Sequence, residues 1–257
     1  GAGRASIRYL SRRGDDAGHN VGTAAGAVGD DHRNRLVRIF GQCRLSDERR
    51  NGEAMGDVVL ALPPSAPRMP RNRLEEGLGR LIMRVFGWRM VGAFPDVPKA
   101  VVIAAPHSSN WDGLLGFAAK FGMGVKLSIL GKDSLLRIPL LGPLLRRHGV
   151  IPVDRSAPHG VVGQASGALR NADCMWYAMA PEGTRKLVER WKPGFWHIAR
   201  NAGVPVVPAY FDYANKVIGI GPAFELTDDM HADIARIQRW YKPFKGRNHD
   251  VVQPRDP

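Results

Sequence analysis

The sequence predicts one α/β domain with a mixed, largely parallel sheet flanked by helices, behind a disordered N-terminal extension. Short apolar runs alternate with helical stretches from about residue 100 onward, which is the element order of α/β proteins. The chain has 257 residues and is 44% hydrophobic, which is enough for one sizeable core. A proline-rich break, LPPSAPRMP, separates this part from the residues before it.

The extension, residues 1–68, differs in composition from the rest. It contains eleven Arg and no Lys, with many Gly, Ala and Asp and little periodicity. The chain does not begin with Met, and Met69 stands where patterned sequence starts. We therefore expect 1–68 to be disordered, as sequence upstream of a natural start would be, and the domain to cover 69–257. A short helix around Arg33–Gln42 and a basic arm for an anionic partner are the alternatives.

Residues 72–90 predict an amphipathic helix. Apolar residues recur there at helical spacing with arginines between them: Leu74, Leu78, Leu81, Ile82, Val85 and Phe86, with Arg73, Arg80, Arg84 and Arg89. Packing on the core and binding to an anionic bilayer both explain such a helix. A second apolar segment, 134–149, is too short to span a membrane. Burial, a membrane interface and an acyl-chain groove stay open for it.

The remaining elements follow from periodicity. We expect strands over Ala100–Ala105, Lys126–Leu130, Val150–Val153, Met175–Ala180, Val204–Phe211 and Val217–Ile220. We expect helices over Trp111–Phe121, Pro139–His148, Gly160–Asn171, Gly194–Asn201 and Asp229–Tyr241. Pro205 and Pro208 suggest that their strand is an edge strand or carries a bulge. His107 and Glu182 directly follow predicted strands, where active-site loops of α/β sheets lie.

The charge and the cysteines narrow the function classes. The formal net charge of +13 favours anionic partners, although a solvated basic surface explains it as well. The two distant cysteines, Cys43 and Cys174, build neither a disulfide framework nor a zinc site. No apolar run reaches the roughly 18 residues of a spanning helix, and the first residues lack the apolar stretch of a secretory signal. Neither a metal site nor nucleic-acid binding is expected.

The run PHSSNWD places His107 and Asp112 five residues apart. In one continuous helix their side chains would diverge by about 140°. They meet if His107 stands in a loop and Asp112 in the first turn of the next helix, with one of residues 108–110 as the N-cap. Asp112 then accepts from one imidazole nitrogen, and the other can take a proton from a hydroxyl. A capping loop with a surface histidine is the structural alternative.

The run PEGTR also follows a predicted strand. Gly183 permits close backbone approach, and Thr184 with the backbone amides can donate to an oxyanion. Arg185 can bind a phosphate through two N–H groups, and Glu182 can hold this arginine or an acceptor hydroxyl. Arg155, at the end of the run GVIPVDR, can complete the anion site. A polar turn with a salt bridge is the alternative.

In chain order, the runs HSSNWD, GVIPVDR, PEGTR and GVPVVPA resemble the four sequence blocks of the glycerolipid acyltransferase family, the lysophosphatidic acid acyltransferase (PlsC-like) superfamily. The similarity covers roughly residues 100–212 and includes order and spacing as well as content. Pro106 stands where the family often has Asn, and Ala180 and Lys186 replace an aromatic residue and a serine. These departures leave the acceptor open. The run RWKPGFWHIA and the compact length are similar to a small bacterial branch.

The resemblance implies that His107 is the general base and Asp112 its partner. It implies that the phosphate-bearing end of the acceptor binds to Arg155, Glu182, Gly183, Thr184 and Arg185. The acyl donor would be acyl-CoA or an acyl carrier protein thioester, with no metal, no cofactor and no covalent acyl-enzyme.

The predicted activity is therefore transfer of a fatty acyl group to the free hydroxyl of a lysophospholipid, with 1-acyl-glycerol-3-phosphate giving phosphatidic acid as the first choice. The protein would work as a peripheral protein on the cytoplasmic face of the cell membrane. Its partners would be the lysophospholipid, the acyl donor and an anionic membrane surface, without nucleic acid. Two alternatives stay open: a non-phosphate acceptor such as a lyso-aminolipid, and a non-catalytic basic module that binds anionic lipid.

Overall fold

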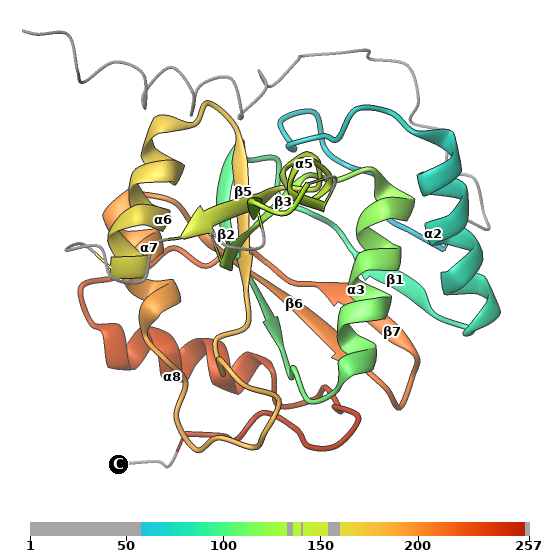
Figure 1. Ribbon diagram of the computed structural model, residues 1–257. Helices are drawn as coiled ribbons and strands as arrows, with labels where there is room; N and C mark the ends of the chain where they lie inside the picture. Colours follow the sequence, from blue (N-terminus) through green and yellow to red (C-terminus); the bar gives the residue numbers. More distant parts are fainter. Residues whose placement is uncertain (1–57, 133–135, 140, 154–159, 255–257) are drawn as a thin grey trace, which may run out of the picture.

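The computed structural model describes residues 58–132, 136–139, 141–153 and 160–254. Its centre is a seven-stranded sheet with the strand order β1-β7-β6-β2-β5-β3-β4 (Figure 1). The strands are β1 (Arg89–Gly92), β2 (Lys99–Ala105), β3 (Leu127–Lys132), β4 (Val150–Val153), β5 (Met175–Met179), β6 (Val206–Asp212) and β7 (Val217–Ile220). Every neighbouring pair is parallel except β6 and β7. The predicted mixed, largely parallel sheet is confirmed.

Helices cover the sheet on both sides. They are α2 (Arg73–Val85), α3 (Asn110–Met123), α5 (Leu141–Arg147), α6 (Gly160–Asn171), α7 (Gly194–Ala202) and α8 (Met230–Trp240). Figure 1 shows α2 and α3 together on one side of the sheet, and α6, α7 and α8 on the other. No helix in the described part of the chain is long and apolar enough to cross a membrane.

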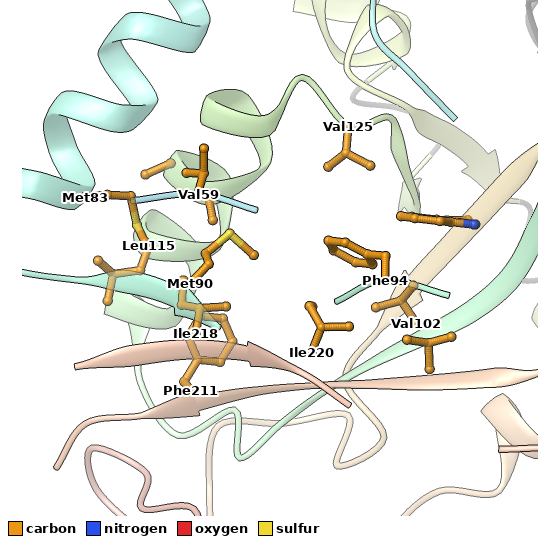
Figure 2. Packing of buried hydrophobic residues seen from close by; sticks show 14 of the residues in the cluster. Val59, Met83, Met90, Phe94, Val102, Leu115, Val125, Phe211, Ile218 and Ile220 are labelled. Atoms are coloured by element: carbon orange, nitrogen blue, oxygen red, sulfur yellow. The ribbon is translucent and has the colours of Figure 1, made fainter. Parts of the chain in front are cut away.

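The alternation of side chains along β2 builds two cores. Ala100 and Val102 point into the cluster beneath α2 and α3, part of which is drawn in Figure 2. Val101 and Ile103 point the other way, into the cluster beneath α6, α7 and α8. Successive strand residues face opposite sides of a sheet, so a strand that is buried on both sides is apolar throughout. This explains the continuous apolar run that predicted β2.

Helix α2 packs on α3 through a glycine and not through its leucines. A Cβ added to Gly79 would lie 2.4 Å from the carbonyl oxygen of Ala118, so only glycine allows this close approach. Gly79 and Met83 are the buried residues of α2. The apolar residues at the predicted helical spacing lie mostly outside: Leu74, Leu78, Leu81 and Val85 are all more than half exposed. Core packing therefore accounts only for the side of α2 that carries Gly79 and Met83, and not for the exposed apolar side.

Strand β1 was not predicted, because the helical pattern of residues 72–90 runs through it. The helix ends at Val85, and Gly87 turns the chain with a positive φ of 70°. Residues Arg89–Gly92 then pair in parallel with β7. The signal that was missed is Gly87, since a glycine behind a helical run commonly ends the helix.

The proline prediction was wrong for Pro208, because β6 is an interior strand between β2 and β7. In antiparallel register Ala209 faces Ile220, so Pro208 faces the residue just beyond the end of β7. Its carbonyl accepts from the N–H of Gly221 at 2.8 Å. The N–H that proline lacks would point to the same side, toward Gly221, which is one residue past the end of β7.

Residues 58–68, which precede the expected boundary at residue 69, pack on the domain. Val59 and Ala66 are buried in the first core. The carbonyl of Val58 accepts from the N–H of Met90, and Cys174 donates from its thiol to the carbonyl of Ser65. This segment contains bends and a turn but no helix or strand, so it gives no periodic signal in the sequence. Residues 1–57, including Arg33–Gln42 and Cys43, lie outside the described residues.

Candidate active site

Three loops meet at one edge of the sheet. Strands β5 and β6 both pair in parallel with β2, so the carboxyl ends of all three point the same way. The loop after β2 carries His107, the loop after β5 carries Glu182, and Tyr213 directly follows β6. Tyr241, fully buried, donates to the carbonyls of Ile103 and Ala209 and so ties β2 to β6 close to this edge. The site therefore lies where open α/β sheets place ligands.

His107 and Asp112 meet as the sequence predicts. Ser109 is the N-cap of α3, and Asp112 accepts from the N–H of Ser109 at 2.8 Å, which completes a capping box. The Nδ1 of His107 lies 3.3 Å from Oδ2 of Asp112. Asp112 is buried, whereas the His107 side chain is 22% exposed. Asp112 thus holds one ring nitrogen, and Nε2 is the nitrogen left for a substrate proton.

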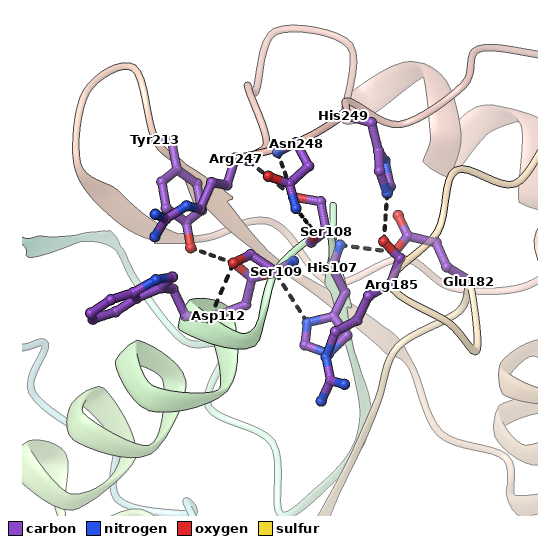
Figure 3. A network of polar contacts seen from close by, with 11 residues as sticks. His107, Ser108, Ser109, Asp112, Glu182, Arg185, Tyr213, Arg247, Asn248 and His249 are labelled. Carbon is purple, nitrogen blue, oxygen red and sulfur yellow. Dashed lines mark hydrogen bonds and ion pairs between the residues drawn. The ribbon is translucent and has the colours of Figure 1, made fainter.

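Tyr213 gives Asp112 a further hydrogen bond, as Figure 3 shows. Its hydroxyl donates to Oδ1 of Asp112 at 2.5 Å. Burial, and then this hydrogen bond, raise the pKa of Tyr213 well above its usual value, so the phenol is a donor at all ordinary pH values. Both carboxylate oxygens of Asp112 therefore have donors, as a buried carboxylate requires.

Glu182 holds the backbone of the histidine loop. Its Oε2 accepts from the N–H of His107 at 2.8 Å, and the residue is 2% exposed. Burial raises the pKa of the Glu182 carboxyl. The sequence predicts two possible partners for Glu182, Arg185 and an acceptor hydroxyl. Among the described residues Glu182 makes no ion pair with Arg185. Its visible role is to position His107 from the neighbouring strand.

The other residues of PEGTR form a turn beside this carboxylate. Gly183 has a positive φ of 67°, which glycine adopts without strain. Thr184 accepts from the N–H of Lys186 through its hydroxyl oxygen at 3.2 Å, so it stabilises the turn. Arg185 is exposed and lies on the His107 side of the network in the view of Figure 3. Arg155, predicted as the second arginine, lies outside the described residues.

A loop near the C-terminus, residues 245–250, fastens the first motif. Ser108, which is buried, accepts at its hydroxyl from the N–H groups of Arg247 and Asn248 at 3.0 and 3.2 Å. The side chain of Asn248 donates to the carbonyl of Ser108 at 2.6 Å. Nε2 of His249 lies 3.1 Å from the carbonyl oxygen of Arg185. The loop thus touches both motif loops (Figure 3).

Sequence reasoning missed Tyr213, Tyr241 and the loop 245–250. Each reaches the site across more than one hundred residues of chain: 101 between Asp112 and Tyr213, and 140 between Ser108 and Asn248. No spacing rule covers such contacts. A weak signal was available for Tyr213 alone, because it directly follows a predicted strand, as His107 and Glu182 do.

The Acyltransferase family model matches residues 93–212, which contain the histidine loop, the PEGTR turn and β6. This part of the chain is similar to the glycerolipid acyltransferase superfamily. The match ends at Asp212, so Tyr213 and the loop 245–250 lie beyond the part of the chain that the family model covers.

Relatives with assigned functions are similar to the same part of the chain. A lysophospholipid acyltransferase of Xenopus tropicalis is 32% identical over 130 residues, 48% of this chain and 23% of that protein. The 1-acyl-sn-glycerol-3-phosphate acyltransferases of Haemophilus influenzae and Escherichia coli are 27% and 28% identical over 145 and 167 residues. These matches cover 53% and 60% of this chain, and 59% and 66% of the relatives. The chain thus spans less than two thirds of each of the three.

One solved structure is similar as well. The crystal structure of the 1-acyl-sn-glycerophosphate acyltransferase PlsC of Thermotoga maritima superposes with a TM-score of 0.47 and 18% sequence identity. The superposition covers 64% of this chain and 75% of the Thermotoga chain.

Proposed function

We propose that this chain transfers a fatty acyl group from an acyl-CoA or acyl carrier protein thioester to the free hydroxyl of a lysophospholipid. The first candidate acceptor is 1-acyl-glycerol-3-phosphate, which would give phosphatidic acid. The family match supports acyl transfer, and the names of the Haemophilus and Escherichia relatives support this acceptor.

The observation that carries the proposal is the arrangement around His107. Its Nδ1 faces the buried Asp112 at 3.3 Å, and its backbone N–H is held by Glu182 at 2.8 Å. One contact fixes the orientation of the ring, and the other fixes the loop that carries it. A partly exposed imidazole with one nitrogen occupied and one open is suited to remove a proton from a bound hydroxyl.

The reaction then follows without a covalent enzyme intermediate. Nε2 of His107 takes the proton of the acceptor hydroxyl while the oxygen attacks the carbonyl carbon of the thioester. The C–O bond forms, the tetrahedral intermediate collapses, and the C–S bond breaks. The departing sulfur receives the proton from His107, which returns the imidazole to its starting state. Asp112 stabilises the imidazolium between these two steps.

The acceptor phosphate would lie on the side of His107 where Arg185 stands. Arg185 is exposed and forms no ion pair among the described residues, so its guanidinium is available to a phosphate. Arg155 and Thr184 would complete this anion site, as the resemblance implies. Gly183 allows the left-handed turn that presents them.

A membrane surface fits the outer side of α2 and α3. Leu74 and Val85 on α2 are 84% and 71% exposed, and Trp111 and Phe117 on α3 are exposed as well. Phe86 contacts Trp111 edge to face at 5.5 Å, which makes the two helices one apolar surface. With the net charge of +13, such a surface suits an anionic bilayer, where a lysophospholipid resides. We propose peripheral binding at the cytoplasmic face.

The test is product detection by mass spectrometry with the full chain. The reaction contains oleoyl-CoA or an oleoyl carrier protein, vesicles, and one acceptor at a time: lysophosphatidate, other lysophospholipids or a lyso-aminolipid. His107→Ala protein is the control for contaminating activity. Diacyl product that disappears with His107→Ala supports the proposal, and the reaction that gives product identifies the acceptor. Product from the lyso-aminolipid alone would show that the acceptor is a lyso-aminolipid and not a lysophospholipid. No product from folded protein would contradict acyl transfer.

A further inference from the structure

The structure contains a pocket of about 260 Å³ on the far side of Asp112 from His107, which the proposed mechanism does not use. Its walls are four apolar or aromatic side chains, one tyrosine and two cations: Phe86, Trp88, Trp111, Leu115, Tyr213, Lys216 and Arg247. Tyr213 forms a wall of the pocket and also donates a hydrogen bond to Asp112. It therefore links the pocket to the pair of His107 and Asp112. The lining comes from the segment between α2 and β1, from α3, from the turn between β6 and β7, and from the loop 245–250.

The pocket has two cationic residues, Lys216 and Arg247. Within the described residues neither Lys216 nor Arg247 takes part in an ion pair, although both line the pocket. The guanidinium of Arg247 lies over the ring of Trp111, with 5.2 Å between Cζ and the ring centroid. This cation–π contact places the charge beside the aromatic wall of the pocket. The backbone of Arg247 is fixed by Ser108, so this cation stands on an anchored loop.

The pocket opens beside the apolar surface of α2 and α3. Phe86 and Trp111 belong to both: they line the pocket, and both are exposed large apolar residues of that surface. An amphiphile could therefore place its charged end in the pocket while its chain stays on the apolar surface. The pocket volume equals that of roughly nine waters at about 30 Å³ each, which is enough for a glycerophosphate head.

We propose that this pocket binds the phosphate-bearing head of a single-chain lipid, with Lys216 and Arg247 as the anion-binding residues. The lipid's chain lies along α2 and α3, and the site captures the lipid from the membrane surface before the hydroxyl reaches His107. The inference deepens the proposed function and rests on it for the identity of the lipid, a lysophospholipid. Lys216 and Arg247 both lie beyond the segment that the family model matches.

The experiment is equilibrium binding without an acyl donor, by calorimetry on the full chain below the lipid's micelle concentration. The probes are 1-oleoyl lysophosphatidate, 1-oleoylglycerol, which has the same chain without phosphate, and oleoyl-CoA. The variants are Lys216→Gln, Arg247→Gln and the double variant. Lys242→Gln removes one exposed charge elsewhere and is the matched control. Arg185→Gln reports on the other anion site.

The expected result is lysophosphatidate binding that is about tenfold weaker in each single variant and weaker still in the double variant, since bonds to charged groups are the stronger kind. Oleoylglycerol binding should be unchanged, and Lys242→Gln should match wild type. Unchanged lysophosphatidate binding in the double variant, or binding lost only with Arg185→Gln, would overturn the proposal. Loss of oleoyl-CoA binding alone would overturn the assignment to a lysophospholipid.

Failure here is distinguishable from failure of the proposed function. Donor-free binding reports the pocket, whereas diacyl product reports catalysis. A chain that binds lysophosphatidate through Lys216 and Arg247 yet yields no product would refute acyl transfer only. A chain that yields product with unaltered binding in the double variant would refute the pocket only. Thermal unfolding of each variant confirms that binding is compared between folded proteins.

Discussion

The hydroxyl of Tyr213 donates a 2.5 Å hydrogen bond to the buried Asp112, on the oxygen that does not face His107. Tyr213, 101 positions from Asp112 in the sequence, thus shares this carboxylate with His107, the proposed base. Because the phenol stabilises the negative charge of Asp112, it moderates how strongly Asp112 holds an imidazolium.

Tyr213→Phe should therefore alter the pH dependence of turnover as well as its rate. Without the phenol, Asp112 holds the protonated His107 more strongly, so the acidic limb of kcat/KM should move to higher pH. The protein should lose about 1–3 kcal/mol of unfolding free energy, as for a lost bond to a charged group. Tyr210→Phe is the control, since Tyr210 lies on β6, three residues before Tyr213, and stacks on Phe244. A lower rate with an unmoved pH profile would make Tyr213 merely structural.

Glu182→Gln tests the buried carboxylate of the PEGTR turn. Burial raises the pKa of Glu182, so above its unfolded pKa the folded protein holds a proton that the unfolded chain has lost. The contribution of Glu182 to the unfolding free energy therefore falls as pH rises through that window. Glutamine keeps an acceptor for the N–H of His107 and removes this titration. The unfolding free energy of Glu182→Gln minus that of wild type should therefore be larger at pH 8 than at pH 4.

Urea unfolding at both pH values measures the effect. Glu225→Gln, at an exposed glutamate, is the control and should follow wild type. A Glu182→Gln stability that tracks wild type at both pH values would show that Glu182 does not titrate between them.

Arg185→Gln should weaken turnover of a phosphate-bearing acceptor more than turnover of a neutral one. If Arg185 grips the acceptor phosphate, kcat/KM for lysophosphatidate should fall roughly tenfold or more, while any rate with oleoylglycerol stays level. The same loss for both acceptors would indicate that the variant disturbs the turn, whose Arg185 carbonyl contacts His249.

The apolar surface of α2 should govern membrane binding. Leu78→Ser with Val85→Ser removes two exposed apolar side chains, so the free energy of unfolding should change by no more than about 0.5 kcal/mol per site. Sedimentation with anionic vesicles should fall at least about tenfold, because each inserted side chain contributes roughly 1.5–3 kcal/mol. Leu187→Ser, also at an exposed leucine, is the control. Equal sedimentation of both variants would rule out this surface as the membrane contact.

The sequence predicted what depends on local spacing. Val150–Val153, Val217–Ile220 and Gly160–Asn171 have the predicted bounds, and the capping geometry that joins His107 to Asp112 follows from six consecutive residues. Contacts that depend on tertiary packing were out of reach. Helix α2 shows this, because its apolar spacing gives a helix, but the close approach at Gly79 decides which side is buried. Tyr213 shows the same in the site, because only the tertiary fold brings it to Asp112.

The most direct test of the central claim is kcat/KM of Asp112→Asn relative to wild type, with lysophosphatidate and oleoyl-CoA. Asparagine keeps an oxygen for Tyr213 but can turn an amide N–H toward Nδ1 of His107, which favours the wrong tautomer for a base at Nε2. We expect a fall of at least about a hundredfold with lysophosphatidate binding retained. A folded Asp112→Asn protein that turns over at the wild-type rate would contradict the proposed base and its orienting carboxylate.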